Sequence, residues 1–362
     1  MNEPLLITGV GAVSTLGLSA TDHTNADEGW VFPNVETAEA TSPGPTGHSL
    51  REVSAGFRIQ DYVTSVGLRR KQRFSHLATA AAVDAFAAAQ LAERPADLER
   101  IGIVANTEYG PQRVVSAYLD GLVGGGLVNA SPGLFTQTVY NVANGQASLA
   151  LGLKGANSTL VGGSAVAYGV QLIETGKADA IFAMSLDETN EIMTDYFDAA
   201  APELDRELPF ATGEAAAVVV LESAGSAGQR GAEPIAHVLG LSLASATGAG
   251  VSYLDWAEED DTIAYAMRAA LDDAGVAVGD VDIVVGTANG LGAITRNEFA
   301  AIRGIGYRGP LALPRLATGE CYGGNEALAH VLALSAAEPG QTLLVTVSTV
   351  NGGVTSAVVR KA

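Results

Sequence analysis

The chain has few of the residues that form disulfides and metal sites. It contains one cysteine, Cys321, in 362 residues, which excludes an internal disulfide framework and a zinc site built from cysteines alone. No two of its five histidines have the spacing of a metal site: His23, His48, His76, His237 and His330. We therefore expect no metal ion.

Basic residues are also scarce. The 20 lysines and arginines are outnumbered by 40 aspartates and glutamates, which gives a formal net charge of −20 at pH 7. So acidic a chain repels nucleic acid and anionic membrane surfaces. No apolar run reaches the length of a membrane span without a glycine or a polar residue, and the first residues lack the basic and apolar regions of a signal peptide. We expect a cytoplasmic protein that binds neither nucleic acid nor membranes.

Hydrophobic residues, in contrast, make up 48% of the chain and charged residues 17%, which is enough for a large core in one or two domains. Two patterns occur twice. The helix–loop–strand pattern of 78–110 recurs at 261–290, and the pattern of 164–188 recurs at 325–349. Such repeats predict two similar α/β halves, each of which needs the other to bury its apolar face. We expect a first half with helical and loop insertions and a second half, at 1–225 and 226–362.

The stretch around Ser164 combines a strand, a turn and a helix. A short β-favouring run, Ser158–Val161, ends in the pair Gly162–Gly163. An apolar helical pattern follows over Ala165–Thr175, and a second buried strand is predicted at Ala180–Met184. Ser164 therefore stands where a helix begins, and the backbone N–H groups and the helix dipole there stabilise a nucleophile or an oxyanion.

Other segments are predicted from the same periodicities. We expect a buried strand over Leu5–Thr8 that is closed by Gly9, Gly11 and a turn at Ser14–Gly17, a helix over Phe74–Gln90 and a strand over Ile101–Ala105. A further helix is predicted at Pro111–Leu122.

Several motifs resemble those of the β-ketoacyl synthases. The start, LLITGVGAVSTLG, is similar to the VITGxGxVSxxG with which ketosynthases begin, and RRKQRF resembles their R-x-M-D-R-F helix. Gly155 and Asn157 match the G-P-N-x-x-x-x-T-A-C motif, and counting forward places Ser164 on its catalytic cysteine. The resemblance covers nearly the whole chain and implies a thiolase-like, duplicated αβαβα layered fold.

Ketosynthases use the cysteine for acyl transfer and two histidines for decarboxylation. On this resemblance Asn289 is the nearest match to the first histidine, within a residue or two, and Glu320 in RLATGECYGG stands on the second. The resemblance thus implies that the chain has lost its catalytic groups. A serine nucleophile needs an adjacent base, and Glu320 is the only candidate that the motifs place near Ser164. We expect Glu320 to be held by an arginine, such as Arg315 or Arg296, or by backbone N–H groups.

The segment SPGLFTQTVYNVANGQ resembles the dimer-interface segment of ketosynthases. The matching interface residues include Ser131, Pro132, Asn141 and Gln146. Together with the lost cysteine, this resemblance implies a chain-length factor, which pairs with an active ketosynthase in type II polyketide assembly and shapes the tunnel in which the acyl chain grows. The residues that the resemblance places along that tunnel are Thr107, Tyr109, Leu134, Phe135 and Thr138.

The resemblance also bears on partners and on the product. Because the acyl carrier protein is acidic in these systems, we expect it to dock mainly on the partner ketosynthase. Serine at the cysteine position departs from the chain-length factors of aromatic polyketides, and the short length and a deletion near Phe210 also suggest a divergent branch. Because partners of this kind occur in highly reducing, polyene-type systems, the resemblance favours such a system, and no cofactor is implied. Two alternatives stay open: a stand-alone acyltransferase that uses Ser164, and a non-catalytic scaffold protein unrelated to polyketides, without an acyl tunnel.

Overall fold

The computed structural model describes residues 5–23, 29–42, 49–200, 204–246 and 256–362. His48 lies outside these residues. The described strands are β1 (Leu5–Ser14), β2 (Val31–Phe32), β3 (Leu50–Arg51), β4 (Ile101–Thr107), β5 (Asn157–Val161), β6 (Ala180–Asp187), β7 (Thr212–Gly213), β8 (Ala215–Ser223), β9 (Ala236–Ser245), β10 (Ile283–Val285), β11 (Leu311–Ala312), β12 (Thr342–Ser348) and β13 (Gly353–Lys361).

The helices cover both faces of these strands. They are α1 (Ala20–His23), α2 (Val35–Glu39), α3 (Val66–Arg69), α4 (Arg73–Ala88), α5 (Gln112–Gly125), α6 (Pro132–Phe135), α7 (Val142–Leu151), α8 (Ala165–Glu174), α9 (Glu191–Ala200), α10 (Ala224–Arg230), α11 (Thr262–Ala274), α12 (Gly292–Gly304), α13 (Arg315–Thr318) and α14 (Asn325–Ala336). Within the described residues, no helix has the length and apolar character needed to cross a bilayer.

The strand order shows the duplication that the repeats predict. One sheet runs β2-β11-β10-β12-β13-β9-β1-β8-β6-β4-β5. When β1, β4, β5, β6 and β8 are numbered along the chain, their order in space is 3-2-4-5-1, and β9 to β13 give the same order. The two sets meet where β1 pairs with β9 in an antiparallel fashion. The strand order thus shows a duplicated α/β fold, and the boundary between residues 225 and 226 stays a prediction.

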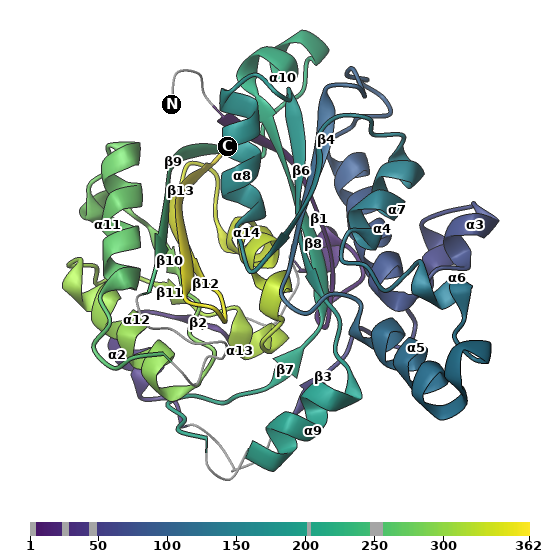
Figure 1. Ribbon diagram of the computed structural model, residues 1–362. Coiled ribbons are helices and arrows are strands. Elements are labelled where there is room, and N and C mark those ends of the chain that lie inside the picture. Colours follow the sequence, from purple (N-terminus) through teal and green to yellow (C-terminus); the bar gives the residue numbers. More distant parts are fainter. Residues whose placement is uncertain (1–4, 24–28, 43–48, 201–203, 247–255) are drawn as a thin grey trace.

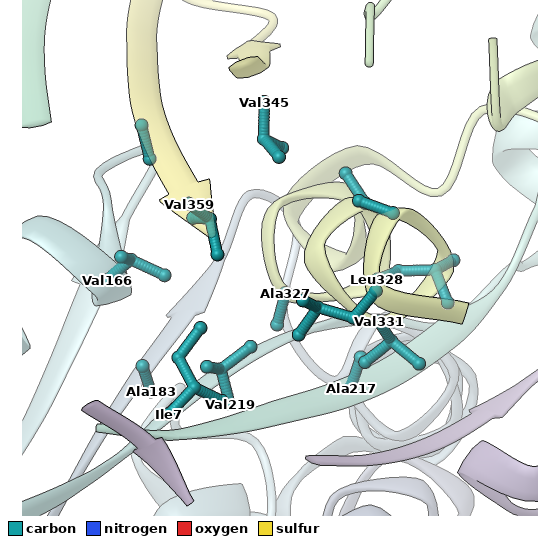
Figure 2. Packing of buried hydrophobic residues seen from close by; sticks show 14 of the residues in the cluster. Ile7, Val166, Ala183, Ala217, Val219, Ala327, Leu328, Val331, Val345 and Val359 are labelled. Atoms are coloured by element: carbon teal, nitrogen blue, oxygen red, sulfur yellow. The ribbon is translucent and has the colours of Figure 1, made fainter. Parts of the chain in front are cut away.

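The helices form three layers around the two halves of the sheet. Figure 1 shows α8 and α14 between the halves, with α4 and α7 outside one half and α11 and α12 outside the other. Each layer has its own apolar cluster. In the central cluster, Val166 of α8 and Leu328 of α14 pack among strand residues such as Ile7 (Figure 2). The expected αβαβα layering is thus present, and it brings the starts of α8 and α14 together.

The predicted end of the first strand at Gly9 is wrong, because β1 continues to Ser14. The glycines serve helix packing instead of a turn. A Cβ atom on Gly9 would lie 2.7 Å from the carbonyl oxygen of Ala85, and one on Gly11 would lie 2.2 Å from that of Ala81. Both carbonyls belong to α4, so the absence of side chains lets this helix pack directly on the strand.

Candidate functional site

Ser164 caps the N-terminus of α8, at the helix start that the sequence predicts. Its backbone is extended, with φ −117° and ψ 112°, and its Oγ accepts a hydrogen bond of 2.9 Å from the N–H of Ala167. A hydroxyl in this position satisfies one of the first N–H groups of a helix, which have no partner within the helix itself. The side chain is 7% exposed.

The Ser164 hydroxyl in turn donates a hydrogen bond to Glu326, in the first turn of α14. The other carboxylate oxygen, Oε2, accepts from the N–H of Ala165 at 2.8 Å and from that of Val166 at 3.4 Å. Burial raises the pKa of Glu326 to about 7, in spite of these hydrogen bonds, which lower it. A carboxylate therefore lies on the N-terminus of α8, where an anion is stabilised.

Glu326 was not predicted, and the interpretation of Glu320 as the acidic residue nearest to Ser164 needs correction. The signal in the sequence was the second repeat: 325–349 echoes 164–188, so the starts of the two helices were candidates for contact. Without the layer order, nothing in the motif showed that Glu326 rather than Glu320 faces Ser164.

Glu320 lies in a second buried cluster. Its Oε2 accepts from Asn289 Nδ2 at 2.9 Å and from Arg315 Nη1 at 2.8 Å, and its Oε1 accepts from the N–H of Tyr322 at 2.8 Å and from the Asn325 amide. Glu320 is fully buried and Arg315 nearly so, which makes this a buried ion pair. The structure thus brings Asn289 and Glu320 into direct contact and provides the expected arginine partner.

The other arginines near these motifs have different partners. Arg296, the alternative partner considered for Glu320, forms ion pairs with Asp205, Glu207 and Glu258. Arg73 of the RRKQRF segment pairs with the buried carboxylate of Glu214. The first is a surface network, and the second ties α4 to the start of β8.

A third buried carboxylate holds the turn after β4. Asp187, the last residue of β6, accepts from the hydroxyl of Thr107 and from the N–H groups of Glu108 at 2.8 Å, Gly110 at 3.0 Å and Gly323 at 2.9 Å. Burial raises the pKa of Asp187 to about 6. The pKa of the neighbouring Glu108 is also raised, by its own burial first and by Asp187 next. Thr107, predicted along the tunnel, is therefore a buried hydrogen-bond donor.

The remaining tunnel candidates divide between the interior and the surface. Tyr109 is half-buried, and its ring meets that of Tyr322 edge-on, with the ring centroids 5.0 Å apart. Phe135 is 57% exposed and its ring lies 5.6 Å from that of Tyr118 on α5. Leu134 and Thr138 are half-buried beside it. Tyr109 is thus part of an interior aromatic pair, whereas Phe135 is exposed.

The predicted interface residues lie on α6 and α7. Ser131 caps α6 by accepting from the N–H of Leu134, and Pro132 is the first residue of that helix. Asn141 precedes α7 and is exposed, and Gln146 on that helix is partly exposed. All four positions are thus on or near the surface of the chain.

Large apolar side chains are exposed around these positions. Val123, Leu127 and Val128 are 85%, 85% and 95% exposed. They lie on α5 and the short 3-10 helix after it (Gly126–Val128), which contacts α5, as α6 does. The strand β5, against which α7 packs, is the last in the sheet order. We call the following residues the outer apolar face: Leu119, Val123, Leu127, Val128, Phe135, Val139, Tyr140, Leu149 and Val161.

Two further groups were considered in the sequence. Cys321 is fully buried, and burial raises its pKa above the ordinary value, as expected of a thiol in the core. In the part of the chain that the structure describes, no three His, Cys, Asp or Glu side chains are grouped so that they could hold a metal ion.

The chain is similar to known β-ketoacyl synthases. No protein-family model matches the chain. The chain is 28% identical over 324 residues to 3-oxoacyl-[acyl-carrier-protein] synthase 2 of Staphylococcus aureus (strain COL), covering 83% of this chain and 77% of that protein. It is 29% identical over 367 residues to a protein of Streptomyces cyaneus named as a polyketide beta-ketoacyl synthase 2, covering 92% of this chain and 84% of the other.

A solved structure has the same fold over the full length. The ishigamide ketosynthase/chain length factor superposes with a TM-score of 0.83 and 22% identity, and the match covers 100% of both chains. At this level of identity the likeness shows the fold.

Proposed function

We propose that this chain, which is homologous to the β-ketoacyl synthases and has their thiolase-like fold, is a chain-length factor. It would have no condensing activity of its own and would pair with an active ketosynthase in type II polyketide assembly. The observation that carries the proposal is the buried cluster of Glu320, Arg315 and Asn289. Its charges are paired with each other, so no group there is free to support decarboxylation, and the cysteine position holds Ser164.

The outer apolar face supports a protein partner. Monomeric proteins seldom expose many large apolar side chains in one region, and such regions mark interaction sites. Among the described residues, no strand pairs with the outer edge of β5, which leaves backbone groups there for a strand of another chain. The interface candidates Ser131, Pro132, Asn141 and Gln146 adjoin this surface. The ishigamide ketosynthase/chain length factor also has this fold. We therefore propose that the partner is a ketosynthase.

The tunnel would then be completed only in the pair. Tyr109 contacts the buried ring of Tyr322, whereas Phe135 is exposed and Leu134 and Thr138 beside it are half-buried. Surface residues can line a channel only if a partner covers them. We propose that Tyr109 and Phe135, the bulky residues of the set, limit the length of the acyl chain, with Thr107 holding the turn beneath them.

The carrier protein would dock mainly on the ketosynthase, because the net charge of −20 repels an acidic partner at long range. We also propose that the assembly works in the cytoplasm. The polyene-type system is proposed because serine replaces the cysteine and because the short length and the deletion near Phe210 indicate a divergent branch.

Co-expression with a ketosynthase that carries the catalytic cysteine and both histidines, taken from a neighbouring reading frame if one encodes it, tests the proposal. Size exclusion is expected to give a pair in equal amounts, and the chain alone is expected to give no elongated product from acyl- and malonyl-carrier protein. A chain that elutes as a monomer in the presence of the ketosynthase would contradict the pairing. Elongation by the chain alone, lost in Ser164→Ala, would contradict the inactive assignment.

Product mass distributions test the tunnel. Phe135→Ala or Tyr109→Ala in the pair is expected to shift products toward longer chains, because each removes a ring from the proposed tunnel end. An unchanged distribution from both soluble, paired variants would place the tunnel end elsewhere.

One observation favours a second candidate, an acyltransferase that uses Ser164. The Ser164 hydroxyl donates to Glu326, whose raised pKa of about 7 suits a general base. This candidate predicts that an acyl thioester adds the mass of its acyl group to Ser164 in the wild-type chain, which intact-mass measurement would detect.

A further inference from the structure

Two buried polar atoms beside Tyr109 have no hydrogen-bond partner among the described residues: the Oε2 atom of Glu108 and the hydroxyl of Tyr322. The two residues are 8% and 3% exposed. Glu108 precedes Tyr109 in the chain, and the ring of Tyr322 meets the ring of Tyr109 edge-on. Buried polar groups without a partner are rare in folded proteins, because each one has lost its hydrogen bonds to water.

The hydrogen bonds of Glu108 indicate which of its oxygens holds a proton. Burial raises the pKa of this carboxyl well above its ordinary value, and Asp187 and Glu320 raise it further, so the neutral form is favoured. Its other oxygen, Oε1, accepts from the N–H of Val350 at 3.2 Å, which is the role of the carbonyl oxygen in a neutral carboxyl. The proton is thus on Oε2, and the described residues supply no acceptor for this O–H group.

The Tyr322 hydroxyl is a second donor of this kind. Burial raises the pKa of Tyr322 well above its ordinary value, and the neighbouring acidic groups raise it further, so the phenol keeps its proton. Its ring packs in the apolar cluster outside the second half of the sheet. A carbonyl oxygen has two lone pairs and no proton, so it accepts from a carboxyl O–H and from a phenol O–H. A hydrocarbon chain accepts from neither.

We propose that Glu108 and Tyr322 form a carbonyl-binding site at the end of the acyl tunnel and select an acyl chain whose far end carries a keto oxygen. The inference rests on the proposed function and deepens it, because a chain that extends to Tyr109 meets both donors. It assigns a substrate class: the end of the chain that comes from the starter unit carries a carbonyl group, even where the rest of the chain is reduced. A hydrocarbon end would leave both donors without a partner.

The chain offers matched variants for each donor. Glu108→Gln keeps both roles, since an amide oxygen accepts and an amide N–H donates, whereas Glu108→Met removes the donor at similar volume. Tyr322→Phe removes the phenol. Its control is Tyr307→Phe, because Tyr307 is also buried but its hydroxyl donates to the carbonyl oxygens of Asp282 at 2.9 Å and of Pro310 at 2.7 Å.

The first measurement uses the chain paired with an active ketosynthase. The pair receives malonyl-carrier protein and an equal mixture of two acyl-pantetheine probes of the same length, one plain and one with a ketone next to its terminal methyl group, over a series of lengths. Mass spectrometry of the elongated products gives the preference for the keto chain. We expect wild type to prefer the keto chain at the length that reaches Tyr109.

This preference should fall about fivefold in Glu108→Met and in Tyr322→Phe, because one hydrogen bond contributes about that factor. Glu108→Gln and Tyr307→Phe should keep it. A pair that elongates both probes equally at every length would overturn the site, and so would a preference that survives both Glu108→Met and Tyr322→Phe.

The isolated chain gives a second measurement, which does not depend on pairing. Without a ligand, Tyr322→Phe should leave the midpoint of urea unfolding unchanged or raise it, whereas Tyr307→Phe should lower it, because only Tyr307 loses hydrogen bonds. An equal fall in both variants would show that the Tyr322 hydroxyl already has a partner, which would overturn the site. A chain that forms no pair would contradict the proposed function instead, and the urea comparison would still decide whether the donor is unpartnered.

Discussion

The interior site and the outer apolar face differ in how completely their groups are partnered. Inside, Glu320 has an arginine, two amides and a backbone N–H, and Glu326 has a hydroxyl and two N–H groups. Outside, Leu127 and Val128 are almost fully exposed. An active site leaves hydrogen-bonding groups available for a substrate. Here the carboxylates of Glu320 and Glu326 already have several partners within the chain. The apolar contacts that the chain leaves unmade are on its surface, which points to assembly.

The largest effect on the isolated chain is expected from breaking the ion pair. Arg315→Met leaves Glu320 charged and buried, which should lower the free energy of unfolding by about 3–5 kcal/mol. Urea unfolding measures it. The double variant Arg315→Met/Glu320→Gln removes the uncompensated charge and should regain part of the loss. A single variant as stable as wild type would show that the pair is not the main support of the interior.

Glu326 should make the stability of the folded chain depend on pH. Its pKa is raised from 4.5 to about 7 in the folded chain, so folding favours the protonated form. The stability it contributes is present below pH 4.5 and is lost as pH rises to about 7. By linkage the loss is up to about 3 kcal/mol.

Urea unfolding across this window, compared between wild type and Glu326→Gln, isolates the effect from Asp187, whose pKa is raised in the same direction. Glu326→Gln should flatten the fall. If the free energy of unfolding falls equally with pH in wild type and in Glu326→Gln, the pKa of Glu326 is not the cause of the fall.

Ser164→Ala should have a moderate effect. It removes the cap of α8 and one donor to Glu326, and the loss of an N-cap hydroxyl typically costs about 1 kcal/mol. Ser223→Ala, which removes the cap of α10 where no carboxylate accepts from the hydroxyl, is the control. We expect Ser164→Ala to be the more destabilising of the two by thermal unfolding, and the reverse order would argue against a strong Ser164–Glu326 contact.

The smallest effect on the isolated chain is expected on the outer apolar face. Leu127→Asp should change the free energy of unfolding by no more than about 0.5 kcal/mol, because the side chain is 85% exposed. In the pair, the buried charge should weaken association, which sedimentation would measure. Tyr265→Asp on α11, on the opposite side of the molecule (Figure 1), should leave association unchanged. Equal pairing by both variants would place the interface elsewhere.

The sequence predicted the layers better than the contacts between them. The repeats identified the two halves, and the pattern around Gly162–Gly163 located the start of α8. The roles of Gly9 and Gly11 were predicted wrongly. In a sequence, a glycine that lets a helix pack directly on a strand cannot be distinguished from a glycine that ends the strand. Glu326 was missed because it is 162 residues from Ser164, and only the packing of α8 against α14 brings them together.

Among the described strands, none pairs with the outer edge of β5, and this has a consequence for the amounts in which the chain and its partner must be produced. A backbone edge flanked by apolar side chains does not distinguish well between a strand of the intended partner and a strand of another copy. Chains made in excess over the partner should therefore associate with one another and form aggregates, and the extent of aggregation should rise with their concentration. Balanced production of the two subunits would then be a condition for recovering either, and light scattering of the chain with rising amounts of ketosynthase would show aggregates falling until the two are equal.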